Sequence, residues 1–257
     1  MTVSMEPRRA GRELVLELAF RPLSNALVPP LKRAGVPPPA VVLANAVTGL
    51  GAALALARGE LIAAAVLLQV KTLLDNTDGQ LARATSRVTL AGRYLDTVAD
   101  LVVNAAVFAA LGYVTEQPVL AGAGFVALTL VLAADFNVTE LYRLTHGAPT
   151  PEPSPSGSRA ERVLAAVYAA VLAPLDHVLR RLASRRFDAP GGYDRFTVTV
   201  LANLGLSTQL VVLGVCLVLD APSAYLWFVL ACLAALAPLQ LRAEREARQT
   251  APRSVTR

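Results

Sequence analysis

The sequence predicts an all-α integral membrane protein with six transmembrane helices and a cytoplasmic, amphipathic N-terminal helix. Three observations lead to this fold class. First, 54% of the 257 residues are apolar and the mean hydropathy is +0.50, which exceeds the values of an ordinary soluble domain. Second, six apolar runs have the length of about 20 residues that a bilayer-spanning helix needs. Third, nearly all basic residues fall between alternate runs, as the positive-inside rule requires.

The first expected element lies within residues 8–33. Leucines and a phenylalanine are flanked there by arginine and glutamate, and the segment is too short and too charged to span a membrane. It predicts one or two interfacial helices, limited by Pro22, Pro29 and Pro30. Residues 1–38 are therefore expected to form a cytoplasmic interfacial segment.

The membrane domain is expected to follow at residues 39–242, and a cytoplasmic tail at 243–257. Its six spans are predicted at residues 39–57, 61–82, 90–113, 118–142, 196–219 and 222–241. The last two spans contain Cys216 and Cys232, which we expect to behave as small apolar residues without a disulfide.

A cytoplasmic loop is expected between the fourth and fifth spans, at residues 143–195. Its Pro/Ser-rich part, 147–158, predicts an extended and mobile segment. The apolar part of 161–182 is interrupted by Pro174, Asp176 and His177, which favours an interfacial helix. The alternative is a seventh span, which would place the C-terminus outside.

The distribution of basic residues predicts the orientation. With the N-terminus in the cytoplasm, 22 of the 24 Lys and Arg residues lie inside, while Arg58 falls in an outer loop and Lys71 within a span. We therefore expect a multi-pass protein of the cell (inner) membrane with both termini in the cytoplasm. The net charge of +5 indicates anionic lipid headgroups as partners, and no nucleic acid.

Four aspartates interrupt the second and third spans. Asp75 and Asp78 share one helix face, as do Asp96 and Asp100, and two helices joined by a short turn would direct all four toward one cytoplasm-facing point. Each carboxylate at bilayer depth costs about 3 kcal/mol, so cations are required. Carboxylates suit Mg²⁺ or Mn²⁺, and two divalent ions would balance four acids, whereas the lack of a nearby His or Cys argues against zinc.

Eight residues around these acids have the spacing of a known signature. They are Asp75, Asp78, Gly79, Ala82, Arg83, Gly92, Asp96 and Asp100. This pattern, which covers 26 residues, resembles the full motif of the CDP-alcohol phosphotransferase family (CDP-alcohol phosphatidyltransferase class I). The resemblance implies a CDP-linked lipid or alcohol donor, release of CMP, and a homodimer.

The resemblance also implies roles for the acids. Asp75, Asp78 and Asp96 are expected to be metal ligands. Asp100 is expected to be the general base that deprotonates the acceptor hydroxyl, and a ligand of the second metal as well.

Other motif residues are candidates for donor binding. On their own, Gly79, Ala82 and Gly92 would indicate close helix packing, but within the motif they favour room for the cytosine and ribose of the donor. Arg83, one turn after Gly79, is expected to contact a phosphate.

Two arginines near the cavity mouth are candidates for acceptor binding. Arg143 and Arg195 lie where the fourth span leaves and the fifth enters the cytoplasmic side, so they either bind a phosphorylated acceptor or serve as plain positive-inside anchors.

Two features depart from the signature or remain open. Lys71, one turn before Asp75, is either a counter-charge for the acids or a nucleotide contact. Many relatives carry a Pro-Asn-x-x-Thr pattern at the start of the first span. Here residues 38–42 read Pro-Pro-Ala-Val-Val, with Asn45 and Thr48 further on, which weakens the expectation of nucleotide contacts from this helix.

The leading hypothesis is phosphatidyl transfer from CDP-diacylglycerol to an acceptor alcohol in phospholipid biosynthesis. Clustered arginines favour a phosphorylated polyol such as glycerol 3-phosphate or an inositol phosphate. An intramembrane prenyltransferase is disfavoured because position 82 is Ala and no second Asp-rich pair follows residue 100. A non-enzymatic divalent cation transporter is disfavoured because the chain lacks two related halves.

Overall fold

The computed structural model of the chain describes residues 13–145, 153–155, 157–171 and 193–250, with the single residues 11, 173 and 177. Almost all of these residues are helical. The described part contains no β-strand, apart from one isolated bridge between Thr89 and Ser154. The expectation of an all-α fold is thus confirmed.

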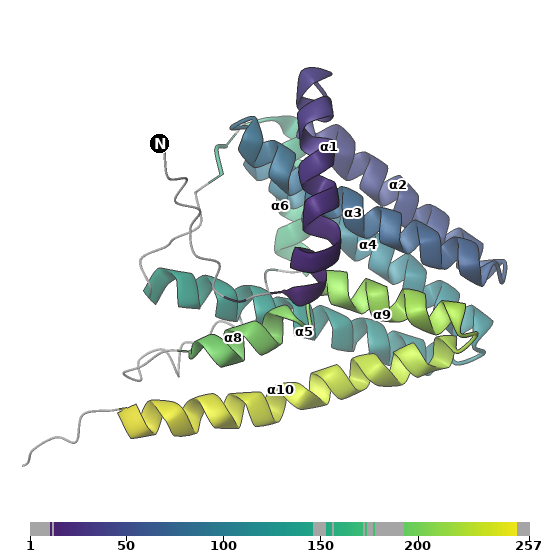
Figure 1. Cartoon of the computed structure of the whole chain (residues 1–257), viewed down its shortest axis with the longest axis vertical. Coiled ribbons are helices and arrows are strands. Elements are labelled where there is room, and N and C mark those ends of the chain that lie inside the picture. The colour runs from purple at the N-terminus through teal and green to yellow at the C-terminus, as the bar shows by residue number, and fades with distance from the viewer. Residues whose placement is uncertain are drawn as a thin grey trace, which may run out of the picture.

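The helices follow the expected order. They are η1 (Leu16–Phe20), α1 (Arg21–Arg33), α2 (Pro38–Ala57), α3 (Leu61–Ala84), α4 (Leu90–Val114), α5 (Pro118–Thr145), α6 (Arg159–Val171), α8 (Arg195–Ala202), α9 (Leu206–Val218) and α10 (Pro222–Thr250). Contacts join α3 to α2 and α9, α4 to α2, α5 and α6, and α10 to α5 and α9. Figure 1 shows this bundle, with α1 crossing α3 and with the C-terminal ends of α3, α5 and α10 toward the same side.

Four described helices are long and apolar enough to cross a membrane, namely α2, α4, α5 and the Pro222–Leu239 part of α10. The bent pair α8 and α9 would add a fifth crossing if it forms one span. Helix α3 is too polar to pass the same test, because Lys71, Asp75, Asp78 and Arg83 lie on it. Its 24 residues nevertheless extend about 36 Å, enough to cross a hydrocarbon core of about 30 Å.

The expected helix limit at Pro29 and Pro30 is wrong, because α1 continues through both residues to Arg33. A proline removes the hydrogen bond to the carbonyl four residues earlier, here those of Asn25 and Ala26. Both of these residues are exposed, so water can bind the freed carbonyls. The expected limit at Pro22 is wrong as well, because η1 continues directly into α1, of which Pro22 is the second residue.

The fifth apolar run is not one straight helix, because α8 and α9 meet at an angle of 43°. Asn203 terminates α8, and its side chain donates a hydrogen bond to the carbonyl of Thr199 (2.8 Å). The same side chain accepts one from the backbone N–H of Leu14 (3.0 Å). The segment that precedes η1 is therefore hydrogen-bonded to the chain at the break between α8 and α9.

The turn between α3 and α4 has the geometry of a Schellman motif. Ser86 adopts a left-handed conformation (φ 54°), and the N–H groups of Ser86 and Arg87 bond to the carbonyls of Arg83 and Ala82. Ser154 pairs with this turn through backbone bonds to Val88 and Leu90. Ser154 belongs to the segment 147–158 that we expected to be extended and mobile, of which residues 147–152 and 156 lie outside the described residues.

Apolar side chains from α2, α3, α4, α5, α9 and α10 form one continuous core. Its fully buried members include Leu56, Leu68, Leu111, Leu213 and Leu226. Cys216 and Cys232 are both free thiols. The expected interfacial helix at 161–182 is described only in part, as α6, which packs against α4. The remainder of that segment and residues 251–257 of the expected tail lie outside the described residues, and α10 continues past the expected span end at 241.

Candidate active site

Three of the four aspartates come together between α3 and α4. One carboxylate oxygen from each of Asp75, Asp78 and Asp96 lies within 4.8 Å of the others. The short turn at 85–89 connects the two helices, α2 packs against both of them, and Thr89 caps α4 by accepting a hydrogen bond from the N–H of Gly92 (3.1 Å). The described residues thus contain a compact group of three acids contributed by two helices.

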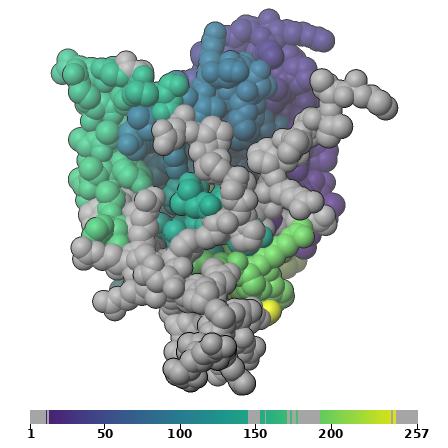
Figure 2. Space-filling model, turned by 90° about the vertical axis from the view of Figure 1, so that its left-hand side faces the viewer, coloured from purple at the N-terminus to yellow at the C-terminus, as the bar shows by residue number. Residues whose placement is uncertain are grey.

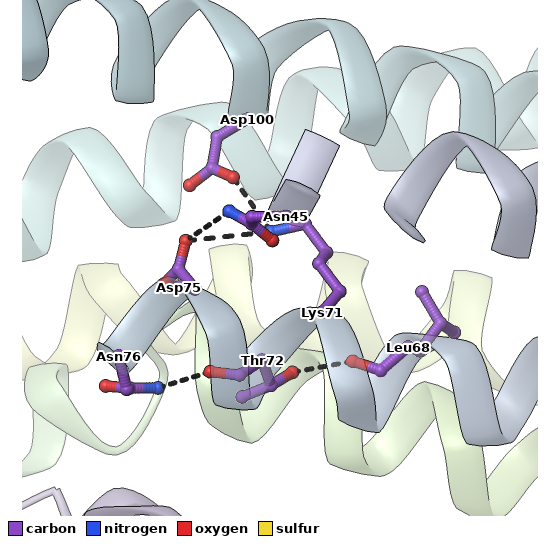
Figure 3. Close-up of polar contacts among 7 residues, drawn as sticks. All are labelled: Asn45, Leu68, Lys71, Thr72, Asp75, Asn76 and Asp100. Atoms are coloured by element: carbon purple, nitrogen blue, oxygen red, sulfur yellow. Dashed lines mark hydrogen bonds and ion pairs between the residues drawn. The ribbon is translucent and has the colours of Figure 1, made fainter. Parts of the chain in front are cut away.

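Asp100 does not belong to this group of three and is instead paired with Lys71. The Lys71 Nζ donates a hydrogen bond to Asp100 Oδ1 at 2.8 Å and lies 3.8 Å from Asp75 Oδ1, as Figure 3 shows. Lys71 is completely buried. The structure therefore resolves the alternatives for Lys71, which is a counter-charge for two acids on different helices.

Asn45 is a site residue that the sequence interpretation discounted. Its side-chain Nδ2 donates a hydrogen bond to Asp75 Oδ1 (3.1 Å), which connects α2 to the acids (Figure 3). Asn45 is fully buried within a predominantly apolar helix. A buried amide in a membrane span was the available signal, because such groups require a polar partner.

Two further polar side chains of α3 bond within their own helix, whereas Gln69 donates to the carbonyl of Leu210 on α9 (3.1 Å). Thr72 donates to the carbonyl of Leu68 (2.9 Å), and Asn76 donates to that of Thr72 (2.7 Å), as drawn in Figure 3. Such local bonds allow hydroxyl and amide groups to remain in an apolar helix without an external partner. Neither of these two side chains therefore binds an aspartate of the acid group.

The acid group fits a hard divalent cation. Asp78 Oδ2 and Asp96 Oδ1 are buried and accept no hydrogen bond. Lys71 supplies one positive charge among four carboxylates, so the cluster retains negative charge in an apolar surrounding. All three converging ligands are carboxylate oxygens, the donors that Mg²⁺ and Mn²⁺ prefer.

Neither motif glycine lies in close contact with a third helix, in contrast to glycines that serve helix packing. A Cβ added to Gly79 would first meet Arg83 Nη1 at 3.4 Å, and one added to Gly92 would meet Thr89 Oγ1 at 3.1 Å. Both contacts are with a nearby residue of the same hairpin. A Cβ at Gly49 would instead collide with Val103 of α4. Helix packing therefore does not explain the small residues at positions 79 and 92.

Substitutions at two of these glycines should separate the two roles. Gly49→Ala should destabilise the protein by about 1–3 kcal/mol, because the new methyl group overlaps Val103. Gly79→Ala should keep or raise the melting temperature, since Ala is the better helix former, and should weaken donor binding by about tenfold. Thermal unfolding and CDP binding measure the two effects. A lower melting temperature for Gly79→Ala would assign Gly79 to packing.

The candidate arginines occupy one end of the bundle. Arg83 is exposed near the end of α3, with its guanidinium beside Gly79. Arg143 is half-buried in the last turn of α5, and Arg195 is exposed in the first turn of α8, a helix that contacts α5. Figure 2 looks onto this end, where the end of the α3–α4 hairpin (blue) lies between α1 (purple) and α6 (green).

Comparison with known proteins identifies one family. The family model described as CDP-alcohol phosphatidyltransferase matches residues 37–186, which is more than half of the chain and includes the complete aspartate motif. No curated protein and no solved structure matches the chain.

Proposed function

Because the chain belongs to the CDP-alcohol phosphatidyltransferase family, whose enzymes transfer a substituted phosphate from a CDP-alcohol to an acceptor alcohol in membranes, we propose that it transfers phosphatidyl from CDP-diacylglycerol. CMP is the released product. The observation that carries this proposal is the convergence of Asp75, Asp78 and Asp96 on one point of a hairpin inside the matched region.

Asp75, Asp78 and Asp96 are proposed to hold the divalent cation on which the family depends, either Mg²⁺ or Mn²⁺. When bound beside the diphosphate, a divalent ion offsets negative charge on the phosphate and on the departing CMP. Asn45 supports this arrangement by orienting the Asp75 carboxylate.

Asp100 is proposed to act as the general base. Its carboxylate takes the proton from the acceptor hydroxyl, whose oxygen forms the new bond to the lipid-bearing phosphorus. The bond from that phosphorus to the oxygen of CMP breaks, and CMP leaves with the bonding electron pair. Lys71 holds Asp100 Oδ1 in a defined orientation during this step.

The donor is proposed to lie over the open surface at Gly79, Ala82 and Gly92. Without side chains at the two glycines, a flat base or ribose can approach the helix backbone. The guanidinium of Arg83 beside Gly79 suits a phosphate oxygen.

The acceptor is proposed to be a phosphorylated polyol, glycerol 3-phosphate or an inositol phosphate. Arg143 and Arg195 lie on the neighbouring helices α5 and α8 and offer the guanidinium groups that bind a phosphate. Either residue alone could instead be a positive-inside anchor, so the acceptor is best identified by a panel.

The proposed function is tested with the purified protein, CDP-diacylglycerol, Mn²⁺ and separate acceptors. We expect CMP release together with a new phospholipid, and the highest rate with a phosphorylated polyol. A higher rate with serine or an unphosphorylated alcohol would reject the acceptor assignment. Absence of CMP release with every acceptor would reject phosphatidyl transfer. It is the result expected of a divalent cation transporter.

We further propose six spans, formed by α2, α3, α4, α5, the α8–α9 pair and α10, with the aspartates near the cytoplasm. Single cysteines at Glu116, in the outer α4–α5 turn, and at Arg87, in the α3–α4 turn, test this in a Cys216→Ala, Cys232→Ala background. An impermeant thiol reagent added to intact cells should label position 116 and not position 87. Labelling of position 87 from outside would show that the proposed orientation is wrong.

A homodimer is proposed as well. Small residues of α4 and α5, including Ala105, Ala109, Gly112 and Gly122, line an open groove suited to close helix contact. Crosslinking in lipid at several protein-to-lipid ratios should give a dimer. A monomer at every ratio would reject this proposal.

A further inference from the structure

The position of Lys71 bears on how many metal ions the site holds. The family assignment and four negative charges led us to expect two divalent ions. However, the ammonium of Lys71 already lies between Asp75 and Asp100, with Nζ–Oδ1 separations of 3.8 and 2.8 Å. These two carboxylates come from α3 and α4, so Lys71 is a counter-charge for acids on two different helices.

The lysine stem has little freedom to leave this position. Lys71 is completely buried, and its Cδ would lie 3.3 Å from a Cβ placed on Gly49. The backbone of α2 therefore closes the space on that side of the stem. Asn45, one turn before Gly49, binds the same Asp75 oxygen that faces Lys71. Helix α2 thus supplies both the surface that confines Lys71 and a second donor to its acidic partner.

The four carboxylates fall into two sets, the group of three and Asp100. The three carboxylates within 4.8 Å of one another can share one divalent ion, for which oxygen ligands lie at about 2.1–2.5 Å. Asp100 is outside that group and is bound to the ammonium. A second divalent ion between Asp75 and Asp100 would lie against a buried positive charge, and like charges repel strongly where little water screens them.

We propose that the buried ammonium of Lys71 replaces a second divalent ion between Asp75 and Asp100, so that the protein's carboxylates hold one divalent ion per chain. This inference rests on the proposed metal site at Asp75, Asp78 and Asp96. It adds that the second cation of the site is the protein's own Lys71 side chain. One divalent ion and one ammonium leave a small negative charge on the four carboxylates.

Counting bound Mn²⁺ tests the inference without any measurement of activity. Mn²⁺ is titrated into metal-free, full-length protein in an uncharged detergent, and the free ion is followed by its EPR signal. The wild type should bind one Mn²⁺ tightly, with no splitting from a neighbouring Mn²⁺. Lys71→Met should bind two, with Mn–Mn coupling in the spectrum of the bound ions.

Two further variants make the test specific. Lys71→Gln retains a hydrogen-bond donor but removes the charge, and should also bind two ions, which keeps the test available if Lys71→Met does not fold. Lys32→Met makes the same change at the other lysine, which bonds to the Ala84 carbonyl at the end of α3, and should bind one.

The outcomes separate this inference from the proposed function. Two tightly bound Mn²⁺ in the wild type would overturn the replacement by Lys71 and leave the proposed transferase intact. One Mn²⁺ in the wild type and also in both Lys71 variants would overturn the role of the ammonium. No bound Mn²⁺ in the wild type would overturn both the inference and the metal assignment.

Discussion

Replacing Asp78 with Asn should reduce turnover by about a thousandfold or more, since a bound metal contributes several kcal/mol of charge stabilisation. Asp78 is buried, and its Oδ2 accepts no hydrogen bond, so this oxygen can serve as a ligand of the proposed metal. The amide keeps the size of the side chain but removes one of three converging charges. CMP release and affinity for CDP-diacylglycerol, measured at several Mn²⁺ concentrations, should both fall, with partial recovery at high Mn²⁺.

The matched control is Asp220→Asn, the same chemical change at an exposed residue of the turn between α9 and α10. Asp220 has a positive φ (54°), a conformation that Asn tolerates, so this variant should retain wild-type turnover and Mn²⁺ binding. The metal assignment would be rejected if Asp78→Asn bound Mn²⁺ and released CMP as the wild type does.

Asp100→Asn should lower turnover by about a hundredfold or more while leaving donor affinity nearly unchanged, because general base catalysis contributes factors of this size. The amide oxygen can still accept the hydrogen bond that Lys71 now gives to Asp100 Oδ1, so the site should keep its shape. The three converging acids are untouched and still bind metal. Added Mn²⁺ should therefore fail to restore the rate.

The same assay distinguishes a base from a ligand. If high Mn²⁺ returns Asp100→Asn to nearly the wild-type rate, Asp100 is a metal ligand only and the base must be sought elsewhere. A loss of donor affinity equal to that of Asp78→Asn would lead to the same conclusion. Thermal unfolding is the folding control, since an unpaired buried charge is destabilising.

The turns between the helices were only partly predictable from the sequence. Glycines at positions 35 and 59 mark helix ends, as expected of a residue that adopts a positive φ without strain. The turn that connects α3 to α4, however, has Ser86 in the positive-φ conformation, and its sequence contains no glycine that would predict this conformation. Pro29 and Pro30 led to the opposite error, because the helix continues through both at a place where the residues one turn earlier, Asn25 and Ala26, are exposed.

The sequence by itself determined the fold class, the family and the shared face of the aspartates. Apolar runs of bilayer length leave helices as the structure that satisfies every backbone group in lipid, and fixed spacings along a helix set which side chains lie on the same face. The membership predicted from the aspartate motif is confirmed by the match over residues 37–186.

Only the tertiary structure decided how these residues are partnered. It paired Lys71 with Asp100, brought Asn45 to Asp75, gave Gly49 and Gly79 different surroundings, and bent the fifth run at Asn203. Helical periodicity specifies the direction of a side chain on its own helix. Its partner depends on the rotation and depth at which another helix packs, and these follow from many small contacts over the whole interface rather than from any local pattern.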